Sequence, residues 1–297
     1  MQGAVRIAMS LIVRDEIDLI AENIRFHAAQ GVDSFIVMDN ASRDGTRERV
    51  GELAKDFDIE IVDQPATDFR KGLWSTELAC RMRETGNADY IISNDADEFW
   101  LSKQGNIKEA LAKREPVLAV RRTNMLPLAD DLNRPDFKFY DAILNVVRPL
   151  GRQQACIDPL VPLNFPMLLR EFPPKIICQL EGLQFIRHGN HDVEHKGGSP
   201  TVSHNLHIYH FPLKRYAQFV KKIEFARERF AREQNPQPGI SWHLRRWVAQ
   251  MDLGTFAEEY ASYPIEREAA ADLEARGIIE RDESIRRFFV RRYGQLA

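Results

Sequence analysis

The sequence lacks several features that would place it in a specialised class of protein. Its three cysteines, Cys80, Cys156 and Cys178, lie far apart and form no C-x-x-C pair. Neither a disulfide framework nor a cysteine-rich zinc site is therefore expected. No stretch approaches the roughly 20 apolar residues that a membrane-spanning helix needs. The apolar run 4–13 is broken by Arg6 and lacks the marks of a signal peptide. These absences predict a cytoplasmic protein.

The chain also lacks a strong excess of charge of either sign. Its 41 basic residues are balanced by 44 acidic residues, which leaves a formal net charge of −3. Such a balance carries no overall electrostatic signature of nucleic-acid binding. Apolar residues make up 44% and charged residues 29% of the 297 positions, as in ordinary globular proteins with one large domain or two modest ones. No nucleic-acid partner is expected.

The first hundred residues alternate between strand and helix patterns. Short apolar strands are predicted at 5–13, 34–38, 59–63 and 90–93, and amphipathic helices at 14–31, 46–57 and 72–86. Gly31 is a natural stop for the first helix. Alternation of this kind predicts an α/β fold with a mainly parallel sheet. Fully apolar strands predict that helices cover both faces of that sheet.

The pattern loosens after residue 101. Strands are expected at 117–128, 143–147, 176–180 and 183–187. An amphipathic helix is predicted at 214–233, a break at 235–239 ("NPQPG") and further helices over 241–293. We therefore expect one α/β domain over 1–212, with halves 1–101 and 102–212, and a C-terminal helical region over 213–297.

Three polar clusters follow the predicted strands directly. They are Arg14-Asp15-Glu16, "DNASRDGT" (39–46) and "NDADE" (94–98). Because ligands of parallel α/β sheets bind beyond the carboxyl ends of the strands, these clusters predict the functional site.

The segment "DNASRDGT" has a structural and a functional interpretation. Turns favour these residue types, and Asp44 or Thr46 is suited to capping the following helix. In addition, Asp39 at the strand end is placed to accept hydrogen bonds from a ribose or a base. The first strand is not followed by the glycine-rich turn of a dinucleotide-binding unit. A calcium loop is excluded because Ala41 and Arg43 occupy ligand positions.

The segment "NDADEF" crowds three carboxylates, Asp95, Asp97 and Glu98, into four positions. A helix cap accounts for one of them. Carboxylates this close raise each other's pKa unless a cation compensates. A divalent Mg²⁺ or Mn²⁺ bridging to a diphosphate is the favoured cation, and pairing with arginine is the alternative. An aspartyl phosphotransferase would carry its D-x-D pair after the first strand, and a nucleotidyltransferase would have a glycine-rich loop there.

Histidines gather late in the chain. Six of the eight lie between residues 188 and 210, at His188, His191, His195, His204, His207 and His210. No cysteine is near, so a closed structural zinc site is not expected. A simpler role for the cluster is that one of its histidines completes the coordination shell of a metal ion held by Asp97. A strand over "LHIYH" places His207 and His210 on opposite faces, and we favour His210.

Taken in order, "RDE", "DNASRDGT", "NDADEF" and a later "YHFPL" resemble the family 2 glycosyltransferases of the GT-A fold, in particular a bacterial subgroup. The resemblance covers residues 7–101 and returns near 188–222. It implies a GT-A-type α/β fold, which is Rossmann-like with a mainly parallel sheet flanked by helices, and a C-terminal helical extension. By this resemblance, 1–101 binds the nucleotide sugar and 102–212 the acceptor.

The resemblance also implies an activity. A sugar would pass from a nucleotide-diphosphate sugar, with a UDP-sugar favoured, to a hydroxyl of a glycan, polysaccharide or lipid-linked acceptor. The transfer would depend on Mn²⁺ or Mg²⁺ and invert the configuration. The expected donor-binding residues are Arg14, Asp15, Glu16, Asp39, Lys71 and Asp95, and the expected metal ligands are Asp97, Asp95 and His210.

The catalytic base is less clearly marked. The family's acidic pair has no clean copy in this sequence. Asp192 and Glu194 are the nearest candidates, followed by Glu181 and Asp158. Two alternatives to a glycosyltransferase stay open, namely a non-catalytic module that binds a sugar nucleotide or glycan, and another nucleotide-dependent transferase.

Basic and aromatic residues alternate in 214–232 and 286–294. The usual meaning is a buried face opposite a solvated one. The alternative is peripheral contact with an anionic membrane surface, at the inner face of the membrane.

Overall fold

The computed structural model describes residues 4–66, 70–233 and 239–294. The chain divides into two compact units. Unit 1 comprises residues 1–122 and 173–209, and unit 2 comprises residues 123–172 and 210–297. This division differs from the expected boundary near residue 212, because residues 123–172 group with the C-terminal region.

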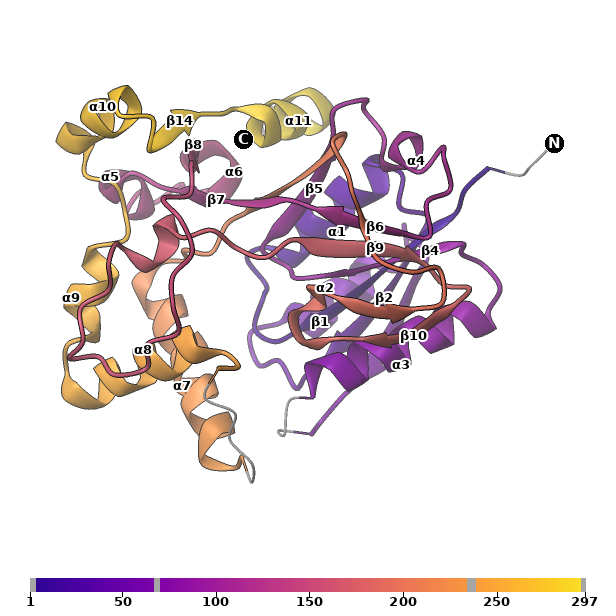
Figure 1. Cartoon of the computed structure of the whole chain (residues 1–297), viewed down its shortest axis with the longest axis horizontal. Coiled ribbons are helices and arrows are strands. Elements are labelled where there is room, and N and C mark those ends of the chain that lie inside the picture. The colour runs from indigo at the N-terminus through magenta and orange to yellow at the C-terminus, as the bar shows by residue number, and fades with distance from the viewer. Residues whose placement is uncertain (1–3, 67–69, 234–238, 295–297) are drawn as a thin grey trace. The chain divides into compact units, whose positions relative to one another are not determined.

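Unit 1 contains a seven-stranded mixed sheet (Figure 1). Its strands, in the order β12-β6-β9-β4-β1-β2-β3, are β12 (Thr201–Val202), β6 (Val117–Val120), β9 (Lys175–Gln179), β4 (Tyr90–Asn94), β1 (Ile7–Val13), β2 (Ser34–Asp39) and β3 (Ile59–Asp63). The four strands from the first hundred residues run parallel. Strand β9 is antiparallel to both β4 and β6. The predicted α/β class with a mainly parallel sheet is confirmed.

Helices cover this sheet. They are α1 (Ile20–Ala29), α2 (Thr46–Leu53) and α3 (Lys71–Glu84); unit 1 also contains the short helix α4 (Ile107–Ala110). Alternate strand residues such as Ala8 and Ile36 pack against Trp74 and Leu78 of α3. Residues on the other face of the same strands, such as Met9, are equally buried. Burial on both faces explains why these strands are apolar throughout.

Unit 1 also contains β5 (Glu98–Ser102), β13 (Leu206–His210), which extends to the first residue of unit 2, and an antiparallel hairpin. The hairpin consists of β10 (Leu183–Ile186), the short 3₁₀ turn η2 (His188–Asn190) and β11 (Val193–His195). Strand β5 was not expected, because the sequence signal for it is a run of only three apolar residues, 99–101. It carries the chain away from the acidic turn.

The first helix begins later than its apolar spacing predicts. It starts at Ile20 rather than near residue 14, because Asp15 adopts the left-handed conformation with φ 54°. Its end near Gly31 is confirmed. Gly31 has φ 98°, and a Cβ atom there would overlap the Asn106 side chain.

Unit 2 is largely helical. Its elements are β7 (Arg122–Leu126), which starts at the last residue of unit 1, α5 (Ala129–Leu132), α6 (Phe139–Ala142), β8 (Asn145–Val147), η1 (Met167–Leu169), α7 (Tyr216–Ala231), α8 (Trp242–Leu253), α9 (Phe256–Ala261), α10 (Arg267–Ala275), β14 (Ile279–Arg281) and α11 (Ser284–Tyr293). Leu126 and Met167 share one apolar core with Phe219, Ile223 and Trp247. This shared core explains why residues 123–172 belong with the C-terminal helices. The predicted break at 235–239 falls almost wholly outside the described residues.

The apolar face of the basic and aromatic C-terminal segment packs inside unit 2. Phe289 of α11 is buried and stacks on Tyr140 with ring centroids 4.4 Å apart. Within the described residues, no helix has the length and apolar character needed to cross a membrane.

Candidate active site

The carboxyl ends of β1, β2 and β4 meet at one edge of the sheet. Val13 pairs in register with Asp39, and Leu11 pairs with Asn94. The three polar clusters therefore leave neighbouring strands at the same edge, as predicted. Two residues of these loops, Asp15 and Ala41, have positive φ angles of 54° and 56°. Such strained backbone in residues other than glycine concentrates at functional sites.

The loops after β1 and β2 hold each other in place. The Asp15 carboxylate accepts a hydrogen bond from the Arg43 amide at 2.7 Å, and the Asp15 amide donates to Ser42 Oγ at 3.0 Å. The Glu16 amide donates to Thr46 Oγ1 at 2.8 Å. Much of "DNASRDGT" thus shapes its own loop, as its turn residues predicted. The N-cap of α2 is Gly45, without a side-chain cap, and Asp44 instead accepts the Thr46 amide at 2.9 Å. The expected contacts of Asp15 and Glu16 with a ligand stay predictions.

Asp39 offers an acceptor that the described residues do not use. The residue is 4% exposed, and its Oδ2 accepts the Ser42 amide at 3.0 Å. Its Oδ1 is buried, and none of the residues placed in the structure donates to it; the same holds for Asn40 Oδ1. Arg14 Nη1 donates to the Asn40 carbonyl at 3.0 Å. Buried polar groups are rarely left unpaired, so these two oxygens fit the N–H or O–H groups of a bound molecule.

Asn23 of α1 fixes the acidic turn that follows β4. Its Nδ2 donates to the carbonyls of Ala96 at 2.9 Å and Glu98 at 3.0 Å. Asn94 Nδ2 also donates to the Glu98 carbonyl, at 3.1 Å. The backbone of the turn is thereby tied to a helix and a strand, which holds its carboxylates in fixed directions.

His27 and Trp100 extend this buried network. Trp100 Nε1 donates to Asn94 Oδ1 at 2.8 Å, and the Trp100 amide donates to His27 Nε2 at 3.1 Å. His27 Nδ1 must then carry the ring proton, which it donates to the Asn23 carbonyl at 2.8 Å. Burial lowers the pKa of His27 to about 3, so the ring is neutral. Trp100 packs in the core with no exposed surface.

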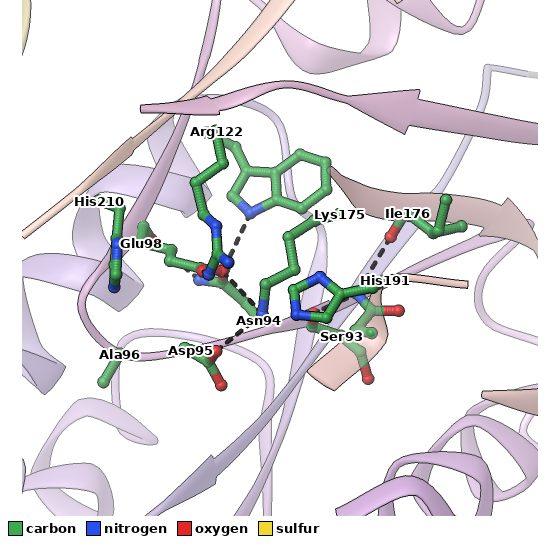
Figure 2. Close-up of polar contacts among 12 residues, drawn as sticks. Ser93, Asn94, Asp95, Ala96, Glu98, Arg122, Lys175, Ile176, His191 and His210 are labelled. Carbon is green, nitrogen blue, oxygen red and sulfur yellow. Dashed lines mark hydrogen bonds and ion pairs between the residues drawn. The ribbon is translucent and has the colours of Figure 1, made fainter. Parts of the chain in front are cut away.

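Two of the three acids are paired with basic side chains. Asp95 Oδ1 accepts from Lys71 Nζ, and Asp95 Oδ2 accepts from Lys175 Nζ at 2.7 Å. Lys175 Nζ lies 3.2 Å from Glu98 Oε2, and Arg122 Nη1 donates to Glu98 Oε1 at 2.5 Å. Figure 2 shows Lys175 between the two carboxylates. The third acid, Asp97, is 6% exposed.

These ion pairs set the protonation states of the side chains around the acidic turn. Burial by itself would raise the pKa of Asp95, but the positive charges of Lys175 and Lys71 outweigh it and hold the pKa well below its usual range. Burial, followed by the charges of Lys175 and Arg122, lowers the pKa of nearby His191 to about 2. Asp95 is therefore ionised and His191 is neutral at physiological pH.

Lys71 was predicted from the sequence as a donor contact, which stays a prediction, whereas the pairing of Lys71, Lys175 and Arg122 with the acids was missed. Lys175 lies 80 residues from Asp95, and Arg122 lies 24 residues from its partner Glu98, so only the fold brings these pairs together. A signal was nevertheless present. Lys175 is a charged residue at the start of the apolar strand "KIICQ", where a buried charge needs a partner.

The predicted bases lie on the hairpin of unit 1. Asn190, with φ 54°, ties this hairpin to β4 by donating to the Ser93 carbonyl at 2.5 Å. Arg187 pairs with Asp192 at 3.5 Å and with Glu194 at 2.9 Å, and all three side chains are at least half exposed. The assignment of either as the base stays a prediction.

The predicted metal ligands fall in different units. Asp97 belongs to unit 1 and His210 to unit 2. His210 Nδ1 lies 2.7 Å from Asn124 Oδ1, and the His207 and Tyr209 rings lie 5.0 Å apart. Over residues 4–66, 70–233 and 239–294, no three or more His, Cys, Asp or Glu side chains converge as a metal site. The metal shell stays a prediction.

Comparison with known proteins gives only distant similarity. No protein-family model matches the sequence, and no curated protein matches it. Similar solved structures include S. aureus TarS 1–349, with 10% identity and a TM-score of 0.42 over 87% of this chain and 72% of that chain. Its UDP complex has 9% identity and a TM-score of 0.43 over 87% and 72%. Its UDP-GlcNAc complex has 9% identity and a TM-score of 0.44 over 88% and 74%. Likeness at this level adds nothing to the site geometry.

Proposed function

We propose that this protein is a glycosyltransferase that uses a nucleotide-diphosphate sugar as its donor. The observation that carries the proposal is the pairing of two features at one sheet edge. One is the buried acceptor Asp39 Oδ1 after β2, and the other is the acidic turn after β4 with Lys71 and Lys175. Strand β1 lies between β2 and β4, so the two features are about 10 Å apart by strand spacing.

That separation suits a nucleoside joined to a diphosphate. Asp39 Oδ1 would accept a hydrogen bond from the base or ribose, and Lys71 would contact the phosphates. Asp95 would face the ribose or the sugar. The motif series "RDE", "DNASRDGT" and "NDADEF" supports the same roles by its resemblance to family 2 glycosyltransferases of the GT-A fold.

The transfer involves an acceptor hydroxyl, a nucleoside diphosphate as leaving group and a carboxylate base. An acceptor hydroxyl, on a glycan, polysaccharide or lipid-linked saccharide, attacks the anomeric carbon. The bond from that carbon to the phosphate oxygen breaks, and its electron pair leaves with the nucleoside diphosphate. A carboxylate takes the hydroxyl proton, and attack from the face opposite the leaving group inverts the configuration. Asp192 or Glu194 would serve as this base after release from Arg187.

A divalent ion is compatible with the residues present. Mg²⁺ is usually bound through one or two carboxylates together with phosphate oxygens and waters. Asp97 offers such a carboxylate in the acidic turn after β4. Asp97 would hold Mn²⁺ or Mg²⁺, and the bound ion would supply Lewis-acid stabilisation of the leaving diphosphate.

One observation favours a second candidate, a non-catalytic module that binds sugar nucleotides. Both predicted bases, Asp192 and Glu194, share Arg187 as a partner and stand largely in solvent. A protein without a working base would bind the donor and not turn it over.

The test is a donor screen that measures nucleoside diphosphate release from a panel of sugar nucleotides, with and without Mn²⁺. We expect release from at least one donor and a loss of about 100-fold or more in D97A, the scale seen when a transition-state stabilising group is removed. D56A is the matched control, because Asp56 is an exposed aspartate after α2, and it should keep wild-type turnover. Binding without release in the wild type would favour the non-catalytic module, and neither binding nor release would refute both.

A further inference from the structure

The acidic turn is part of a chain of alternating charges. The order is Lys71, Asp95, Lys175, Glu98 and Arg122, and each neighbouring pair forms an ion pair. The five residues come from α3, the turn after β4, β9, the start of β5 and the start of β7. Three cations thus serve two carboxylates, Asp95 and Glu98.

Burial changes along this chain. Glu98 and Lys175 are 0% and 1% exposed at their side chains, and Arg122 is 7% exposed. Lys71 and Asp95 are 17% and 27% exposed. Buried charges of this kind persist only when they are paired, so the Glu98 end is fixed. The Lys71 end is the part that a ligand can reach.

The pairing at Asp95 allows Lys71 to change partner. Each Asp95 oxygen accepts one ammonium group, Lys71 on Oδ1 and Lys175 on Oδ2. If Lys71 moves to a phosphate, Asp95 keeps the buried Lys175 as its counter-charge. Asp95 then still pairs with Lys175, and Glu98 still pairs with Lys175 and Arg122.

The start of α3 adds to the attraction for an anion. This 14-residue helix begins at Lys71, follows Arg70, and has no acidic residue in its first turn. In the part of the chain that the structure describes, no side chain caps its first amides. Free amides at a helix start bind phosphate groups well.

We infer that this protein binds the diphosphate of its donor through Lys71 and the start of α3 without needing a divalent ion. The inference rests on the proposed function. Charge crowding at Asp95, Asp97 and Glu98 suggested a bridging metal from the sequence, but Asp95 and Glu98 are already paired with Lys71, Lys175 and Arg122. The role of a divalent ion at Asp97 is then confined to turnover, and donor affinity is set by the protein's own cations.

Calorimetric binding of UDP, GDP, CDP, ADP and dTDP tests this, in excess EDTA and in Mn²⁺. We expect at least one diphosphate to bind in EDTA, no more than about 10-fold weaker than in Mn²⁺. In EDTA, K71M should weaken it by about 10- to 100-fold, the range for a charge-assisted hydrogen bond. K71R retains the charge and should keep most of the affinity. K55M removes an exposed lysine after α2 and should match the wild type.

The outcomes separate this inference from the proposed function. Binding in Mn²⁺ with none in EDTA overturns the inference and leaves the glycosyltransferase proposal standing. Wild-type affinity of K71M in EDTA, with a thermal unfolding midpoint like that of K55M, overturns the role of Lys71. Absence of binding in both conditions, for every diphosphate, counts against the proposed function itself.

Discussion

Acidification should destabilise this protein through His27, which the fold keeps neutral. The pKa of the buried ring is about 3 in the folded chain and about 6.5 in an unfolded one. Between these values the unfolded chain binds a proton that the folded chain does not, so stability falls as the pH falls. The stability that comes from keeping His27 neutral is fully present above about pH 6.5. It is lost progressively as the pH falls to about 3. At 1.36 kcal/mol per unit, the loss at pH 5 is about 2 kcal/mol.

The assay is urea unfolding at about pH 7 and about pH 5, followed by circular dichroism. H27Q retains a donor and an acceptor but does not titrate, so its free energy of unfolding should fall by about 2 kcal/mol less than that of the wild type. Other titrating groups, such as His191, contribute equally to both proteins and cancel in the comparison. H204Q replaces an exposed histidine, and its free energy of unfolding should change with pH as that of the wild type does. An unchanged pH dependence in H27Q would refute the reasoning.

Two further predictions concern buried hydrogen bonds. W100F removes the indole donor and leaves Asn94 Oδ1 without its 2.8 Å partner, so urea unfolding should show a loss of about 1–3 kcal/mol; a neutral effect would mean that the turn is held by other contacts. In unit 2, Y263F removes a hydroxyl that donates to Glu259 at 2.6 Å and accepts from Trp247 Nε1 at 2.5 Å. Its unfolding free energy should also drop by about 1–3 kcal/mol, and wild-type stability would contradict this assignment.

The sequence predicted the part of the fold that local patterns encode. The four parallel strands, their helices and the shared edge of the three polar clusters follow from apolar runs and turn residues. Asp39 and Asp95 could be placed at that edge because a residue just after a buried strand has little freedom of position. The later strands β9 and β10 were also predicted, from short apolar runs.

What the sequence did not reveal depends on contacts between distant segments. Lys175 is 80 residues from Asp95, and nothing near either residue indicates the other. The crowding of Asp95, Asp97 and Glu98 pointed correctly to a compensating cation, but local sequence does not distinguish a metal from lysines delivered by the fold. The grouping of residues 123–172 with the C-terminal helices was missed for the same reason, since it rests on a shared core.

Donor binding at the edge of the sheet is tested most directly by the affinity of D39N for nucleoside diphosphates. The Ser42 amide donates to one Asp39 oxygen, so in the variant it will select the oxygen of the substituted side chain and turn the side-chain nitrogen toward the ligand. A ligand N–H or O–H then meets a donor in place of an acceptor. We predict a loss of about 10- to 100-fold in affinity by calorimetry, with wild-type affinity in the exposed control D56N. Equal affinity of D39N and wild type, or no binding of any nucleoside diphosphate to the wild type, would contradict the account.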